Sequence, residues 1–280
     1  MDFEQHIKSK DFGQLTSKLI AQFNSLLAEK GKNGYYVLFS VGPGVDGAGA
    51  PGMSSAVALK LLTEAVGPAK VRPVIFEMDG YTNPEWVEKA ARYADSLDLD
   101  CLRVDATELG RVYCGLLESH GVEKYPESVF TRLRAILIHD LAMKDDFLTA
   151  SCYTKISGAF YKVSNVSDTA QTAPLGEFDR ISTIKIGECL GIDGNILYQP
   201  PSNGAVKEME ANRMMNRFFT GFDRWELRLS TQLDEIMYHL DKGMPIPTYA
   251  DTRLNDAALR AQEDYIALKG HLDLINGVTG

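Results

Sequence analysis

The sequence predicts an α/β fold built on a parallel sheet, and two observations carry this prediction. Short apolar runs rich in β-branched and aromatic residues alternate with longer amphipathic stretches from residue 12 to residue 151. The first run, at 35–41, is short and apolar and is followed by glycines, as is typical of a strand covered on both faces. We therefore expect a Rossmann-like parallel sheet with helices on both faces, followed by a helical C-terminal part.

The expected elements follow from the positions of the apolar runs and of the turn residues between them. Pro73 is unusual for a central strand, because proline cannot donate a hydrogen bond to the ladder. In chain order we expect a helix at 12–30, a strand at 35–41, a glycine-rich loop at 42–52, a helix at 54–66, a strand at 71–78, a helix at 84–97, a strand at 99–104, helices at 106–120 and 126–144, and a strand at 147–151.

Capping residues mark the starts of these helices. Asn83 and Asp105 offer side-chain oxygens to the free amides of a first helical turn. Pro126 suits a first turn, where its missing amide proton costs no hydrogen bond. Ser54 or Ser55 is expected to cap the helix that follows the glycine-rich loop.

The second half of the chain differs in texture. Residues 152–173 are polar and aperiodic, and we expect a loop or lid over the sheet edge where open α/β sheets bind ligands. A helix at 177–190 and a linker at 194–204 are expected next. The rest, 205–276, is expected to be mostly helical, with a break at 244–249.

Length and charge limit the domain count and the class of partner. The 280 residues suit a single domain over 1–280, with an N-terminal helix at 1–34, an α/β core at 35–204 and a helical extension at 205–280. The 29 Lys and Arg residues against 38 Asp and Glu residues give a formal charge of −9. This balance argues against a nucleic-acid partner, because a phosphate backbone needs a basic surface.

The same sequence predicts a cytoplasmic protein with no membrane contact. No apolar run reaches the roughly 18 residues of a membrane helix, and the polar N-terminus lacks the pattern of a signal peptide. The four cysteines are far apart and form no CxxC pair. They are expected to be buried thiols, not disulfide partners or zinc ligands.

The first candidate site is the glycine-rich segment that contains Ser40, Gly42, Gly44, Asp46 and Gly47. Glycines between a strand and a helix let backbone amides approach a phosphate, and a helix N-terminus favours an anion. The segment lacks the Gly-Lys-Ser/Thr ending of a Walker loop. Phosphate binding and a plain flexible loop both fit this motif, and the residues alone leave both open.

Two weaker candidates lie further along the chain. Arg132 and Arg134 are two positions apart on an expected helix, so they cannot share one face. We expect one of them to face a site and the other to face solvent. Ser202 follows the rigid Pro200–Pro201 pair, which would hold its hydroxyl toward a ligand. A solvated helix face and a plain linker are the alternative interpretations.

Taken together, these segments resemble the ammonia-dependent NAD synthetase family. The clearest similarity covers residues 131–202, and the N-terminal strand–loop–helix and STQLDEIMYHL (230–240) extend it weakly. TRLRAILIHDLA is similar to the family's arginine-containing helix, FLTAS to the strand before its Gly-Thr-x-x-x-x-Glu turn, APLGEFDRISTIKIGECLGI to its Pro-Leu, Lys and Leu-Gly positions, and QPPSNG to its Lys-Pro-Pro-Ser-Ala-Gly element.

This resemblance implies a reaction and a fold. The family belongs to the ATP-pyrophosphatases, with an adenine nucleotide α-hydrolase-like fold. It adenylates the carboxylate of nicotinic acid adenine dinucleotide with ATP, and ammonia then displaces AMP. ATP, Mg²⁺ and a homodimer are therefore implied, with free ammonia as nitrogen donor because no glutaminase domain accompanies this sequence. The apolar stripe Leu15–Leu27 fits either a subunit contact or packing on the chain's own sheet.

The resemblance also implies roles for individual residues. Asp46 takes the place of the catalytic aspartate that holds Mg²⁺, and Arg180 that of a phosphate-binding lysine. Arg132, Arg134 and Asp168 are expected at the dinucleotide substrate. The ATP phosphates are expected near Ser40, Gly42, Gly44, Asp46, Gly47, Ser54, Ser55 and Ser202.

The sequence departs from the family pattern at several of these points. Gly47 stands where the family loop closes on a serine. If residues 51–55 are the aligned segment instead, Ser54 replaces the metal-binding aspartate. In the gapless alignment Ser157 replaces a metal-binding glutamate and Asn165 replaces a lysine. Losing one preorganised electrostatic group typically costs roughly 10²–10³ in rate.

Three hypotheses follow. The chain is a divergent NAD synthetase with Mg²⁺ held by Asp46 and a substitute carboxylate, Glu177 or Asp179. Alternatively it is an inactive family member that binds a nucleotide or serves as a structural dimer. In the third hypothesis it is a ligase that adenylates a different acid.

Overall fold

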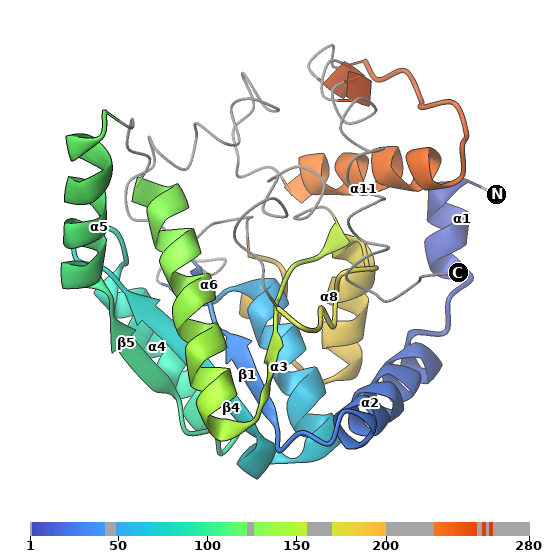
Figure 1. Ribbon diagram of the computed structural model, residues 1–280. Helices are drawn as coiled ribbons and strands as arrows, with labels where there is room; N and C mark the ends of the chain where they lie inside the picture. The colour runs from blue at the N-terminus through green and yellow to red at the C-terminus, as the bar shows by residue number, and fades with distance from the viewer. Residues whose placement is uncertain are drawn as a thin grey trace.

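A four-stranded parallel sheet forms the centre of the molecule in this computed structural model (Figure 1). The structure describes residues 2–42, 49–121, 126–155, 170–199, 227–250, 254–255 and 258–259. The strand order is β5-β4-β1-β6, and every neighbouring pair runs parallel. A separate two-stranded antiparallel hairpin, β2-β3, follows the end of β1. The predicted α/β fold with a parallel sheet is confirmed.

The bounds of the elements are as follows. The strands are β1 (Tyr35–Leu38), β2 (Val41–Gly42), β3 (Ala50–Pro51), β4 (Val71–Glu77), β5 (Leu102–Asp105) and β6 (Leu148–Ala150). The helices are α1 (Phe3–Lys8), α2 (Phe12–Glu29), α3 (Met53–Val66), the 3₁₀ turn η1 (Pro68–Lys70), α4 (Pro84–Asp95), α5 (Thr107–Ser119), α6 (Pro126–Asp145), α8 (Arg180–Cys189), α9 (Gly194–Leu197) and α11 (Leu227–Asp241).

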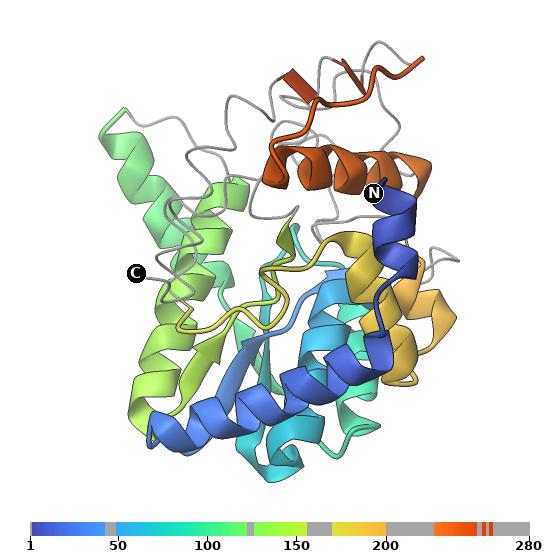
Figure 2. The same cartoon turned by 90° about the vertical axis from the view of Figure 1, so that its right-hand side faces the viewer.

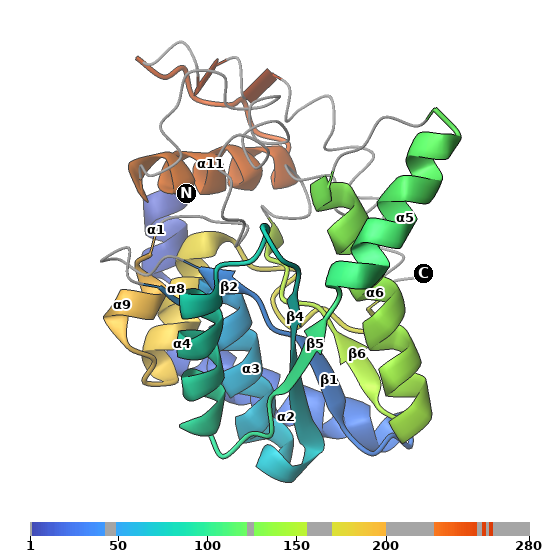
Figure 3. The same cartoon turned by 90° about the vertical axis from the view of Figure 1, so that its left-hand side faces the viewer.

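Helices cover both faces of the sheet (Figure 3). One core joins β1 and β6 to α2, α3, α4 and α8, and a second core lies between the sheet and α6. Consecutive tyrosines of β1 show the alternation of the strand. Tyr35 donates its hydroxyl to Phe23 O of α2 at 2.7 Å, whereas Tyr36 donates to the Asp145 carboxylate at the end of α6. Because successive side chains of a strand point to opposite faces, this pair ties both layers to the sheet.

Pro73 lies in a central strand without breaking a ladder. Val74 O accepts from Phe39 N, so Val74 presents its backbone polar groups toward β1 and Pro73 presents its own toward the β5 side. The pairing with β5 begins only at Val74 opposite Leu102. The missing amide proton of Pro73 therefore removes no sheet hydrogen bond.

The stripe of α2 packs inside the molecule. Leu19, Phe23 and Leu27 are buried in the core that α2 shares with α3 and α8. Of the two interpretations of the Leu15–Leu27 stripe, packing on the chain's own core is therefore the observed one. Figure 2 shows α2 running along the lower part of this layer.

Several predicted boundaries need correction. The strand expected at 35–41 divides into β1 and β2, and the strand expected at 99–104 pairs only from Leu102, after a turn in which Asp98 has φ of 58°. The helix expected from 177 begins at Arg180, because Asp179 caps it. The linker expected at 194–204 contains α9, which the Asp193 side chain caps.

The helix expected at 54–66 begins one residue earlier, at Met53, and its predicted cap is wrong. Gly52 is the N-cap residue, and as a glycine it has no side chain with which to cap the first turn. Ser55 lies inside the helix, where its hydroxyl bonds to Ser40 instead. The Asn83 cap is confirmed, since its side chain accepts from Glu85 N and Trp86 N.

Helix α11 lies beyond the carboxyl ends of the strands and packs on α8 and α1 (Figures 1 and 2). The non-helical stretch at 244–249 matches the predicted break. The expected structures at 205–226, over most of the chain after 250 and at the centre of the lid at 152–173 lie outside the described residues. Within the part of the chain that the structure describes, no helix is both long and apolar enough to cross a membrane.

Candidate nucleotide site at the carboxyl edge of the sheet

The strand order creates a switch point between β1 and β6. From β1 the chain builds outward through β4 to β5, and then returns to the other side of β1 as β6. Ligands of open α/β sheets bind in the crevice at such a point, outside the carboxyl ends of the strands. Ser40 follows β1 and Ser151 follows β6, so both belong to this edge. The Ser151 hydroxyl is buried and has no hydrogen-bond partner among the described residues.

A serine pair joins the end of β1 to the first turn of α3. The Ser40 and Ser55 hydroxyl oxygens lie 2.7 Å apart, and Ser40 N donates to Ser55 Oγ at 3.2 Å. Gly52 N donates to Ser40 O at 2.9 Å. A Cβ atom at Gly52 would lie 2.4 Å from Ser40 Oγ, so glycine is required there by close packing. The start of α3 thus lies beside the end of β1, and its N-cap residue, a glycine, offers no side chain to the first-turn amides.

The hairpin that follows β1 is held by Gln199. Gln199 is buried, and its Nε2 donates to Pro51 O at 2.7 Å and to Ile196 O at 2.9 Å. A Cβ atom at Gly42 would lie 2.3 Å from Gln199 Oε1. Gly42 therefore has a packing reason to be glycine, and its predicted contact with a phosphate stays a prediction.

Arg180 lies at the start of α8 and points toward this hairpin. Its guanidinium Nη2 donates to Gln199 O, and its backbone amide donates to the Asp234 carboxylate at 3.0 Å. Ile181 N donates to the other Asp234 oxygen at 2.9 Å. The structure thus places Ser40, Gly42 and Ser55 beside the hairpin and links Arg180 to it through Gln199.

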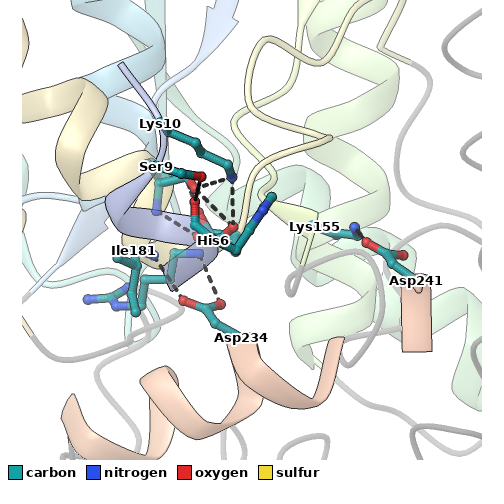
Figure 4. A network of polar contacts seen from close by, with 11 residues as sticks. His6, Ser9, Lys10, Lys155, Ile181, Asp234 and Asp241 are labelled. Atoms are coloured by element: carbon teal, nitrogen blue, oxygen red, sulfur yellow. Dashed lines mark hydrogen bonds and ion pairs between the residues drawn. The ribbon is translucent and has the colours of Figure 1, made fainter. Parts of the chain in front are cut away.

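Asp234 is a fully buried carboxylate on α11 (Figure 4). Burial raises its pKa well above the usual range, and the nearby Asp179 carboxylate adds to this effect. The two amides of α8 act in the opposite direction, because they bond to the charged form. A carboxylate at a helix N-terminus also interacts favourably with the helix dipole.

A second carboxylate of α11, that of Asp241, contacts residue 155, which directly precedes residues 156–169. Asp241 pairs with Lys155 (Figure 4), whose backbone amide donates to Phe178 O at 3.0 Å. Burial lowers the pKa of the Lys155 ammonium. Asp234 and Asp241 are seven residues apart, so they lie on one face of α11 and fasten it to two different segments.

The two arginines of α6 are both half-buried, and the expectation that one faces a site and the other faces solvent stays a prediction. Arg134 lies over the Phe130 ring at 4.8 Å, and Phe130 packs on Tyr81, just beyond the end of β4. The Nε atoms of Arg132 and Arg134 are buried and have no partner among the described residues.

Other predicted site residues lie outside the described residues. These are Gly44, Asp46, Gly47, Asp168 and Ser202, together with the departures Ser157 and Asn165. Ser54 is described and lies in the first turn of α3.

A metal centre finds no support in the described part of the chain. There, no three His, Cys, Asp or Glu side chains gather closely enough to hold a metal ion. Asp179, one of the two expected substitutes for the missing glutamate, is engaged instead in capping α8 through Ser182 N and Oγ. Glu177, the other, is exposed.

Sequence reasoning missed Ser151, Gln199 and Asp234 as site residues. Asp234 did leave a signal, because it interrupts the apolar stripe Leu233, Ile236 and Met237 of α11. A carboxylate on the apolar face of a helix is buried only where hydrogen-bond donors of another segment bond to it. Gln199 left a signal too, because it begins the QPPSNG segment and stands where the similar family element has a lysine.

Solved structures of known enzymes share this fold. NMN synthetase from Francisella tularensis superposes with a TM-score of 0.68 at 15% identity, covering 91% of this chain and 96% of that one. NH3-dependent NAD synthetase from Campylobacter jejuni gives 0.66 at 14% identity, with 92% and 96% covered. NAD+ synthetase from Burkholderia pseudomallei gives 0.65 at 16% identity, with 93% and 90% covered. No curated protein sequence matches this chain.

A family comparison identifies the chain more specifically than its fold does. The model of the NAD synthase family matches residues 44–241, which include α3, the sheet from β4 to β6, α8 and α11. This match spans most of the sequence. The chain therefore belongs to the NAD synthase family.

Proposed function

We propose that this protein is an ATP-dependent ligase that amidates nicotinic acid adenine dinucleotide with ammonia. A carboxylate oxygen of the dinucleotide attacks the α-phosphorus of ATP, and pyrophosphate leaves. Ammonia then attacks the acyl carbon of the adenylate, AMP leaves with that oxygen, and the nitrogen loses a proton. Membership of the NAD synthase family supports this reaction.

The observation that carries the proposal is the edge around Ser40, Ser55 and Gly52. The N-cap residue of α3 is a glycine, which offers no side chain to the first-turn amides, and a helix N-terminus favours a phosphate. These amides stand beside the switch point at which open α/β sheets bind nucleotides. Arg180 adds a cation at the hairpin next to this helix. We assign ATP to this edge, with the phosphates toward the start of α3.

The dinucleotide acid is assigned to the α6 side of the same edge. Arg134 lies there over Phe130. Its unpartnered buried Nε and that of Arg132 are donors that an anionic ligand would satisfy. Asp168 keeps its predicted role at this substrate.

Mg²⁺ enters the proposal only through Asp46. The described residues do not form a metal site, so no step here is routed through the ion. When bound, Mg²⁺ would neutralise charge that develops on the phosphates. Asp46→Ala is expected to abolish amide formation, and unchanged activity would exclude Asp46 as the metal ligand.

The protein is proposed to act as a homodimer in the cytoplasm. The exposed apolar side chains of α5 and α6 offer a surface for a second copy of the chain, since they form a stripe with no partner among the described residues: Leu109, Val112, Leu116, Ile136 and Met143. The spacings of three, four and seven residues place them along one side of each helix.

An endpoint assay by mass spectrometry tests the reaction. Purified protein is incubated with ATP, Mg²⁺ and ammonium, and with either nicotinic acid adenine dinucleotide or the corresponding mononucleotide. The second acid is included because one structural neighbour is named NMN synthetase. NAD and AMP appearing in equal amounts from the dinucleotide is the expected result. Glutamine in place of ammonium is expected to give no product.

The alternative hypotheses correspond to other outcomes of this assay. Product from the mononucleotide alone would assign a different acid. ATP and both acids unchanged, with ATP still bound, would identify an inactive nucleotide-binding member of the family.

A further inference from the structure

We propose that Gln199 is a positioning residue that sets the phosphate-facing turn of α3 and couples it to Arg180. This inference rests on the proposed function, since it assigns ATP to the edge that Gln199 supports. Gln199 itself is 2% exposed, so it acts through its neighbours.

The Gln199 side chain holds both strands of the β2-β3 hairpin. Both protons of Nε2 are used, on Pro51 O at 2.7 Å and on Ile196 O at 2.9 Å. Its Oε1 lies against Gly42, where a Cβ atom would be 2.3 Å away. The amide therefore fixes β3 by a hydrogen bond and β2 by close contact, and it anchors both to α9.

The position of this clamp gives it a role beyond packing. Pro51 directly precedes Gly52, the N-cap residue of α3. The Gln199 bond to Pro51 O therefore fixes the turn whose next amides open the helix. Ser55 of α3 ties the first turn to Ser40, and Gln199, which is 148 positions away from Pro51, holds the residue just before the N-cap. The direction of the first-turn amides therefore depends on residue 199 as well as on the serine pair.

The backbone of the same residue places the cation. Gln199 O accepts from the Arg180 guanidinium, and Arg180 N is fixed in turn by Asp234. One residue thus connects the helix N-terminus and the arginine that are assigned to the phosphates. Preorganised donors of this kind lose effect when their position is no longer fixed.

Three substitutions separate positioning from packing. Gln199→Met keeps the length and removes both donors. Gln199→Glu keeps the shape and sets a carboxylate against two carbonyl oxygens. Gln199→Lys restores a donor that can reach the same carbonyls. Asn33→Leu is the control, because it removes a side-chain amide hydrogen bond to a backbone carbonyl, Asp145 O, at the opposite edge of the sheet.

Two readouts apply to each variant of the full chain. The first is the dissociation constant for ATP with Mg²⁺, measured by calorimetry. The second is hydrogen exchange of peptides that cover residues 49–58. Gln199→Met and Gln199→Glu are expected to weaken ATP binding by about tenfold, the effect of losing one or two buried hydrogen bonds. They are also expected to raise exchange in 49–58, while Gln199→Lys restores both and Asn33→Leu changes neither.

The outcomes distinguish this inference from the proposed function. Unchanged ATP binding and unchanged exchange in Gln199→Met would overturn the inference. The same loss in Asn33→Leu would also overturn it, by showing a general effect of stability. If the wild-type protein binds ATP but forms no product, the proposed reaction is contradicted. ATP binding and hydrogen exchange of the variants then still test the role of Gln199. Wild-type protein that binds no ATP overturns both.

Discussion

Individual buried polar residues define the site, and they are the part that the sequence does not reveal. Gln199 bonds to a residue 148 positions away, and Asp234 bonds to residues 54 and 53 positions away. Neither the short-range pattern of the sequence nor its composition predicts which distant residue such a side chain contacts. Asn83 and Asp179, by contrast, cap helices through amides two or three residues away. Their local geometry is why capping could be anticipated at Asn83.

The Asp234→Asn variant tests the buried carboxylate. The native pKa of Asp234 lies above its ordinary value of 3.8, so the folded protein binds this proton more tightly than the unfolded chain. The contribution of this group to stability is therefore fully present below pH 3.8 and is lost as pH rises through the raised native value. The variant has no such dependence, although its amide leaves one α8 N–H unsatisfied at a cost of about 1–3 kcal/mol.

Melting temperatures of both proteins across pH check this expectation. The stability advantage of the wild type over Asp234→Asn should shrink as pH rises. Because other groups titrate in both proteins, the difference isolates Asp234 and its coupling to Asp179. An advantage that grows with pH would contradict a raised pKa.

At the scale of elements, the alternation of helices and strands follows from short-range signals. β1 and the Val74–Phe76 part of β4 are apolar and supply side chains to the cores on both faces of the sheet. The hairpin β2-β3 and the start of α3 at Met53 depend instead on Gln199 and on the Ser40–Ser55 pair. These tertiary contacts explain why the expected serine cap is absent.

The exposed face of α5 and α6 makes a prediction about association. Val112→Glu places a charge within the apolar stripe and is expected to shift a homodimer to monomer at micromolar concentration. Burying one unpaired charge in an interface costs several kcal/mol. Sedimentation velocity measures the shift, and Arg92→Glu, an exposed change on α4 across the sheet, serves as control. If the wild type is a monomer, or if Val112→Glu is still a dimer, the dimer contact does not lie on this surface.

At the scale of the whole molecule, the elements converge on one edge of the sheet. The switch point between β1 and β6, the start of α3 and the hairpin beside Arg180 all lie where the strands end. Helix α11 lies beyond that edge and is fastened to α8 by Asp234 and to Lys155 by Asp241. This arrangement and the family match together support a ligase that joins ATP chemistry to amide formation.

An isotope-transfer experiment tests the adenylated intermediate most directly. Nicotinic acid adenine dinucleotide labelled with ¹⁸O in its carboxylate is incubated with the protein, ATP, Mg²⁺ and ammonium, and the AMP is analysed by mass spectrometry. If the carboxylate attacks the α-phosphorus, each AMP formed carries one ¹⁸O atom and equals the NAD produced. Unlabelled AMP, or NAD formed without AMP, would contradict the proposed mechanism.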